Sequence, residues 1–152
     1  MAILRVGQPA PLFSGKLDDG AEFRLKDYAG KANVVLYFYP KDDTMGCTRE
    51  ACAFRDSYDA IKKRDAVLVG VSSDSEESHK SFKEKNSLPF PLLADPEKKI
   101  IKAYDTLGFG FLPTKRVTYL IDKKGIIQGI FRHELAMDKH RDDVLNWLEA
   151  NV

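Results

Sequence analysis

The sequence predicts an α/β domain in which helices flank a mixed sheet. Short apolar runs alternate with helical stretches through the first two thirds of the chain, and two strand-like runs around a polar turn follow near the end. The length of 152 residues is within the usual range for one domain. We therefore expect residues 1–152 to form a single α/β domain.

The first predicted elements are a hairpin and two buried strands. Asp18-Asp19-Gly20 lies between residues 12–17 and 21–25 and predicts the turn of a β-hairpin. Val34–Tyr39 is apolar on both faces, as expected for a central strand that is covered on both sides. Ala66–Val71 has the same character and predicts a second buried strand.

A helix from Cys47 to about Arg64 is predicted between these two strands. Apolar residues follow Cys47 at offsets of 4, 7, 11 and 14, which define one helical face, namely Ala51, Phe54, Tyr58 and Ile61. Cys47 lies on that face, whereas Cys52 lies about 100° around the helix from its neighbour Ala51. A cysteine that only packs in a core prefers burial, so the position of Cys52 is unusual.

The remaining elements complete a strand–helix–strand–helix order that is followed by an antiparallel hairpin and a helix. They are a polar helix at 75–86, a short strand at 91–94, a short helix at 97–104, a hairpin at 117–121 and 126–131 around the turn 122–125, and a last helix at 138–150. This is the order of a thioredoxin-like fold, with a mixed sheet flanked by helices and an N-terminal β-hairpin extension.

Composition and charge exclude several classes of protein. Hydrophobic residues make up 43% and charged residues 31% of the chain, and the net charge is +1, so nothing favours a nucleic-acid or membrane surface. No apolar run approaches the ~20 residues that span a bilayer. Met1–Arg5 lacks the pattern of a signal peptide. We expect a cytoplasmic protein; a transit peptide that had already been removed would leave no trace in this sequence.

The most informative stretch is the octapeptide Pro40–Cys47, which follows the first buried strand and precedes the predicted helix. It puts Cys47 in the first helical turn, with the hydroxyl of Thr44 three residues before it. Amides at a helix N-terminus stabilise an anion, and cysteine reactivity depends on ionisation to the thiolate. The stretch therefore predicts a reactive cysteine, and Thr44 is also a plausible N-cap.

Cys47 and Cys52 are the two cysteines of the chain. Two are too few for a secreted disulfide scaffold, and C-x₄-C without a nearby histidine does not predict a zinc site. In an intact helix, Cα atoms five residues apart are roughly 8–9 Å apart, beyond the ~7 Å that a disulfide tolerates. A disulfide between them therefore requires the helix start to unwind. The pair alone is equally consistent with two small core residues.

Pro40, Thr44 and Cys47 match the Pro-x-x-x-Thr/Ser-x-x-Cys active-site motif of the peroxiredoxins, a family that this chain resembles. Glu50 matches the acidic residue often found three positions after the cysteine. Cys52, five residues after Cys47, is the mark of the Q-type branch, also called bacterioferritin comigratory protein. The resemblance extends over nearly the whole chain, including residues 69–74, 91–95, 119–122 and 144–148.

The resemblance implies a thiol-dependent peroxidase, active in antioxidant defence, that reduces hydrogen peroxide and organic hydroperoxides. By position, Cys47 is the peroxidatic cysteine, and Cys52 resolves its sulfenic acid to an intramolecular disulfide that thioredoxin or a similar dithiol reduces. The resemblance implies that the Thr44 hydroxyl hydrogen-bonds the thiolate and the peroxide, and that Arg116 stabilises both. It also implies that Pro40 excludes water from the site and that Glu50 orients Arg116. No cofactor is implied, and an internal resolving cysteine allows a monomer or a weak homodimer.

The chain departs from the family pattern at two places. Met45 stands where many Q-type members have a second proline, and residues 107–113 are unlike the usual loop before the arginine. Phe109 and Phe111 in that loop are expected either to pack half-buried or to form an apolar rim for peroxide substrates. Three histidines far apart in sequence are expected on the surface, namely His79, His133 and His140.

Two other functions use the same residues differently. A redox sensor or disulfide-exchange partner would use the Cys47 and Cys52 pair to signal rather than to remove peroxide. An inert thioredoxin-like interaction domain would have no peroxidase turnover. Peroxide consumption that depends on Cys47 separates the enzyme from both alternatives.

Overall fold

The computed structural model describes residues 4–109 and 113–151. Its elements are β1 (Ser14–Leu17), β2 (Glu22–Arg24), the 3₁₀ helix η1 (Leu25–Tyr28), β3 (Asn33–Phe38), α1 (Met45–Asp56), α2 (Tyr58–Lys62), β4 (Ala66–Ser72), α3 (Glu76–Asn86), β5 (Leu92–Ala94), α4 (Lys99–Ala103), β6 (Val117–Ile121), β7 (Ile127–Arg132) and α5 (Met137–Ala150). The strands form one sheet in the order β2-β1-β5-β4-β3-β6-β7. β3 pairs in parallel with β4 and antiparallel with β6, so the sheet is mixed, as predicted.

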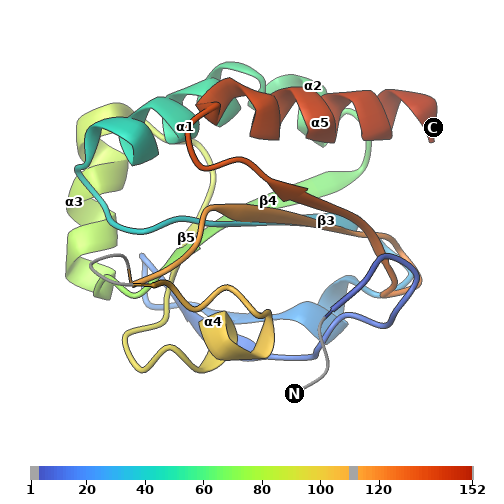
Figure 1. The fold of residues 1–152 in the computed structure, drawn as a ribbon, viewed down its shortest axis with the longest axis horizontal. Coiled ribbons are helices and arrows are strands. Elements are labelled where there is room, and N and C mark those ends of the chain that lie inside the picture. Colours follow the sequence, from blue (N-terminus) through green and yellow to red (C-terminus); the bar gives the residue numbers. More distant parts are fainter. Residues whose placement is uncertain (1–3, 110–112, 152) are drawn as a thin grey trace.

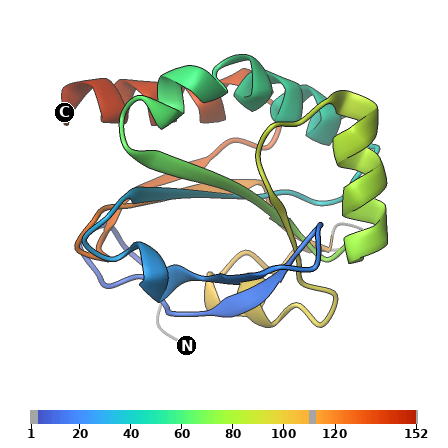
Figure 2. The same cartoon turned by 180° about the vertical axis from the view of Figure 1, so that it is seen from behind.

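Helices cover both faces of this sheet (Figure 1). α1, α2 and α5 lie over one face, and α1 packs against α5. α3 joins the same side through Phe82, which belongs to the apolar cluster beneath these helices. α4 and η1 lie on the other side of the sheet, next to the β1–β2 hairpin that forms one of its edges (Figure 2).

Strand β3 joins the two halves of the core because its side chains alternate between the faces of the sheet. Val34, Leu36 and Phe38 point into the cluster on the side of α4. Val35 and Tyr37 point into the cluster on the side of α1 and α5. The strand is buried almost throughout, in agreement with the apolar run that predicted it. Its end therefore delivers the following loop to a fixed place.

Most predicted elements are present, and the thioredoxin-like α/β class is confirmed. The Asp18-Asp19-Gly20 turn joins β1 to β2 in an antiparallel pair. Ser75 caps α3 by accepting a hydrogen bond from the backbone N–H of Ser78 at 3.1 Å. Among the described residues, no helix is both long enough and apolar enough to cross a membrane.

The single helix expected over residues 47–64 is wrong in two respects. The helix begins two residues earlier, at Met45, and it ends at Asp56, before α2 starts at Tyr58. Ser57 between them has φ −111° and ψ 7°. Its N–H bonds to the carbonyl of Phe54, three residues back, at 3.2 Å. Polar side chains such as those of Asp56 and Ser57 compete with helical backbone bonds, which favours a break at this point.

Candidate active site

Cys47 is the third residue of α1 and is 1% exposed. The loop that leads to it leaves the end of β3, so a buried strand and a helix start fix its position together. Its sulfur lies in the apolar cluster beneath α1 and α5. The helix start faces a cation rather than a carboxylate, because α1 has no acidic residue in its first turn and Arg116 approaches the cysteine. Both features place positive electrostatic potential beside the sulfur.

Arg116 donates a hydrogen bond through Nη1 to the sulfur of Cys47 at 3.3 Å. The two residues are 69 positions apart, and strand pairing joins them: Val117, which follows Arg116, is opposite Phe38 at the end of β3. Arg116 is 6% exposed. Burial opposes its charge, but Glu50 and Cys47 more than offset burial, so its pKa lies above the ordinary value.

Glu50 lies one turn after Cys47 and is fully buried. Its Oε1 accepts from Nη1 of Arg116 at 2.9 Å, so one guanidinium nitrogen contacts both carboxylate and sulfur. Burial raises the pKa of the Glu50 carboxyl to about 8, and Arg116 opposes the rise. Oε2 has no hydrogen-bond partner among the described residues and lies 3.5 Å from Nε2 of His140. The Glu50 carboxyl group thus holds the arginine from a fully buried position.

Thr44 and Pro40 lie at the mouth of the site. Thr44 is at the N-cap position of α1, but its hydroxyl donates to the carbonyl of Lys41 at 2.9 Å. The expectation that this hydroxyl caps the helix is wrong, because it turns back into the loop instead of toward the helix amides. Pro40 is buried at the end of β3 and borders the cavity next to Arg116.

A cavity of about 690 Å³ opens over Arg116 and the start of α1. Its walls include Gly46, Phe109, Leu135 and Met137. Phe109 is 88% exposed at this mouth, so half-buried packing is wrong for it: its ring projects outward at the cavity rim. Phe111, the other aromatic residue of the predicted rim, lies outside the described residues.

Cys52 lies apart from this group. It is half-buried, and both cysteines are free thiols within the continuous helix α1. Helix geometry therefore keeps their Cα atoms roughly 8–9 Å apart. Of the predicted site residues, the structure brings Cys47, Glu50 and Arg116 into direct contact, places Pro40 and Thr44 at the mouth, and leaves Cys52 on the helix beyond.

The expectation that the histidines lie on the surface is wrong. His79 and His140 are fully buried and His133 is partly buried, because each meets polar partners from other elements. His140 Nδ1 is 2.8 Å from the hydroxyl of Thr118, and Nε2 is 2.8 Å from the carbonyl of His133. Burial lowers the pKa of His140 to about 4, so it is neutral beside Glu50. Sequence reasoning missed it because its apolar helix face gives no sign of the carboxylate that α1 brings.

Comparison with known proteins agrees with this geometry. Residues 6–130 match the AhpC/TSA family. Peroxiredoxin Bcp of Bacillus subtilis is 49% identical over 128 residues, which are 80% of this chain and 81% of that protein. The chloroplastic peroxiredoxin Q of Populus jackii is 46% identical over 146 residues, 95% of this chain and 68% of that protein.

A solved structure gives the same result for the fold. The bacterioferritin comigratory protein of Xanthomonas campestris, whose structure was studied for its alkyl peroxide reduction activity, superposes with a TM-score of 0.86 at 32% identity. The superposition covers 99% of this chain and 98% of that one. The chain therefore belongs to the AhpC/TSA family, in its peroxiredoxin Q and bacterioferritin comigratory protein branch, and is a thiol peroxidase.

Proposed function

We propose that Cys47 is the peroxidatic cysteine of this peroxidase. The observation that carries the proposal is the hydrogen bond from Arg116 Nη1 to the Cys47 sulfur at 3.3 Å between two buried residues. The Cys47 thiolate attacks one peroxide oxygen with an electron pair, and the O–O bond breaks. The sulfur becomes a sulfenic acid, while the other oxygen takes a proton and leaves as water or an alcohol.

In this step Arg116 stabilises the negative charge on the attacking sulfur and the charge that develops on the leaving peroxide oxygen. Its planar guanidinium offers several donors in a fixed fork, and one of them already contacts the sulfur. Donors aimed at the oxygen on which charge develops are the largest catalytic effect in many active sites. Glu50 holds the fork in place through the same nitrogen. In this proposal Pro40 excludes water from the mouth, and the Thr44 hydroxyl bonds the peroxide.

Cys52 is the proposed resolving cysteine. Its thiolate attacks the Cys47 sulfenic sulfur, so that an S–S bond forms, the S–O bond breaks, and the oxygen leaves as water once protonated. Because both residues lie in one continuous helix, the first turns of α1 must unwind before the sulfurs meet. An external dithiol such as thioredoxin then reduces the disulfide by exchange and restores both thiols.

The proposed substrates are hydrogen peroxide and organic hydroperoxides. Apolar residues border the cavity, and Phe109 and Leu135 are 88% and 90% exposed there. An alkyl chain would cover this apolar surface while its peroxide group meets Arg116. The alkyl peroxide reduction studied in the Xanthomonas campestris protein supports the same substrate class.

The proposal extends to the domain organisation, the cellular compartment and the oligomeric state of the protein. Residues 1–152 form one peroxiredoxin domain that works in the cytoplasm. An internal resolving cysteine needs no partner subunit, so a monomer or weak homodimer suffices.

Coupled turnover tests the proposed function. Hydrogen peroxide is supplied with thioredoxin, thioredoxin reductase and a nicotinamide reductant, and the wild type is compared with Cys47→Ser. We expect turnover that disappears in the variant. Turnover that survives without the Cys47 thiol would contradict the proposal, and stoichiometric oxidation of Cys47 without turnover would favour a redox sensor.

A further inference from the structure

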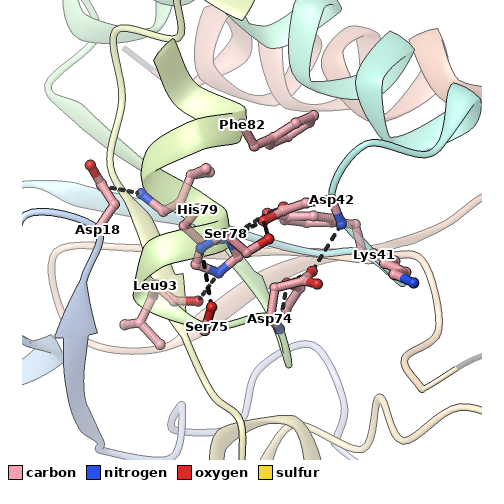
Figure 3. A network of polar contacts seen from close by, with 12 residues as sticks. Asp18, Lys41, Asp42, Asp74, Ser75, Ser78, His79, Phe82 and Leu93 are labelled. Atoms are coloured by element: carbon pink, nitrogen blue, oxygen red, sulfur yellow. Dashed lines mark hydrogen bonds and ion pairs between the residues drawn. The ribbon is translucent and has the colours of Figure 1, made fainter. Parts of the chain in front are cut away.

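A buried polar network ties the loop before α1 to helix α3 (Figure 3). Asp42 lies in this loop, five residues before Cys47, and His79 lies in the first turns of α3. Their side chains are 1% and 0% exposed, and His79 Nδ1 is 2.7 Å from Asp42 Oδ2. Burying such a pair is costly unless further hydrogen bonds satisfy both groups. The remaining partners therefore show what the pair holds together.

Asp42 accepts hydrogen bonds from two other side chains. The hydroxyl of Tyr39 donates to Oδ1 at 2.6 Å, and the hydroxyl of Ser78 donates to Oδ2 at 2.9 Å. His79 Nε2 lies 3.0 Å from the carbonyl of Leu93, which can only accept. Nε2 therefore donates to this carbonyl, and Nδ1 faces the Asp42 carboxyl group. The network joins β3, the loop, α3 and β5.

The backbone of the loop is held at the same residue. The N–H of Asp42 donates to Oδ2 of Asp74 at 2.9 Å, and the hydroxyl of Ser72 donates to that oxygen at 2.6 Å. Asp42, Asp74 and His79 offer ligand atoms within 4.8 Å of one another. Direct hydrogen bonds already occupy these atoms, so the group is a closed polar network rather than a cavity for a cation.

The chain after Asp42 is held much more loosely. Asp43 is exposed, and its ion pair with Lys85 at 3.1 Å lies on the surface. Asp43 also has a φ of +63°, in the left-handed region that few residues other than glycine, asparagine and aspartate adopt. Thr44 is exposed and bonds back to Lys41, and Met45 is 90% exposed. A boundary between fixed and loosely held chain therefore lies between residues 42 and 44.

We propose that Asp42 and His79 are positioning residues that clamp the active-site loop. In the reduced enzyme the clamp holds Pro40 to Asp42 in place, so that the following helix start meets Arg116. While the disulfide forms, the same clamp is the fixed end from which α1 unwinds, beginning at Thr44. This inference rests on the proposed roles of Cys47 and Cys52, and neither clamp residue touches the peroxide.

Substitutions at neighbouring aspartates test the positioning role. Asp42→Ala removes the acceptor of the network, whereas Asp42→Asn retains its shape and can donate to a neutral His79. Asp43→Asn is the matched control, because it makes the same charge change one residue away at an exposed site that tolerates positive φ. The measurement is the second-order rate constant for oxidation of Cys47 by hydrogen peroxide, in competition with a haem peroxidase.

We expect Asp42→Ala to lower this rate constant about tenfold, Asp42→Asn to recover most of it, and Asp43→Asn to match the wild type. Ile100→Ala, in the core cluster on the α4 side of the sheet, controls for lost stability. Each protein is assayed at a temperature and under solution conditions at which its own unfolding curve shows it to be fully folded. The proposal would be overturned if the Asp42→Ala protein reacted at the wild-type rate. It would also be overturned if Ile100→Ala lowered the oxidation rate constant as much as Asp42→Ala does.

Amide exchange on the wild type provides a test without substitution. In the Cys47–Cys52 disulfide form, we expect the amides of residues 48–53 to lose protection and those of Tyr39, Asp42 and residues 78–82 to keep it. Loss of protection in the two clamp segments would overturn the inference. A different result would contradict the proposed function, namely a Cys47→Ser protein that still turns over peroxide, so the two failures can be told apart.

Discussion

Replacing Arg116 by methionine tests how the site stabilises charge. Nη1 of Arg116 contacts the Cys47 sulfur at 3.3 Å and the Glu50 carboxylate at 2.9 Å. Methionine keeps an unbranched apolar stem but has no charge and no donor. The change therefore leaves the thiolate and the developing charge on peroxide without their donor, and it leaves Glu50 buried without a cation.

The magnitude follows from the bonds that are lost. A hydrogen bond to a charged group is worth about 1.5–3 kcal/mol, and removal of one donor from an oxyanion site costs about 2.7–4 kcal/mol. One guanidinium serves the sulfur and the oxygen together, so the two values are not added. A loss of about 3 kcal/mol in transition-state stabilisation corresponds to a rate constant lower by roughly 150-fold.

The assay is oxidation of Cys47 by hydrogen peroxide in competition with a haem peroxidase. Arg49→Met is the matched control, because Arg49 lies on the same helix with its side chain 70% exposed and only a 3.4 Å contact to Asp138. We expect the control to react at the wild-type rate. An Arg116→Met protein whose rate constant falls less than about threefold would refute the reasoning.

Two further predictions concern residues around this contact. At Gly46 an added Cβ would lie 2.7 Å from Met137 Cε, the flexible end of a side chain that can move aside, and 3.2 Å from Arg116 Nη2, so Gly46→Ala should lower the oxidation rate by only about threefold. Adding Met137→Ala should restore part of the loss; no recovery would show that the methionine is not the obstacle. The pKa of His140 is lowered from 6.5 to about 4, so its contribution to stability is present above pH 6.5 and is lost as the pH falls toward 4. Urea unfolding at pH 7.5 and 4.5 should show that the free energy of unfolding falls by about 2–3 kcal/mol more in the wild type than in His140→Gln, and equal losses would contradict the assignment.

Local patterns predicted the elements well because each pattern is contained in its own segment. The apolar run Val34–Tyr39 is buried strand β3 and its continuation, and the turn at Asp18-Asp19-Gly20 joins a real hairpin. The break at Ser57 was not predicted, because the apolar spacing continues across it to Ile61, which is buried. Periodicity records which face is covered and does not record a local change of backbone angles.

Contacts between distant segments were harder to predict from residue patterns. Arg116 was assigned to the site by its resemblance to the family, since its contact with Cys47 depends on the pairing of β3 with β6. His79 and His140 were expected on the surface, yet both are buried. A histidine becomes a core residue only when other elements bring acceptors such as Asp42, and no spacing within one helix reveals that.

The order of oxidation at the two cysteines tests the central claim most directly. One equivalent of hydrogen peroxide is added to the Cys52→Ser protein and to the wild type, and a sulfenic-acid trap and mass spectrometry locate the products. We expect sulfenic acid on Cys47 in the variant and a Cys47–Cys52 disulfide in the wild type. A Cys47 that stays unmodified in the Cys52→Ser protein, or sulfenic acid on Cys52 of the wild type with Cys47 unmodified, would contradict the account.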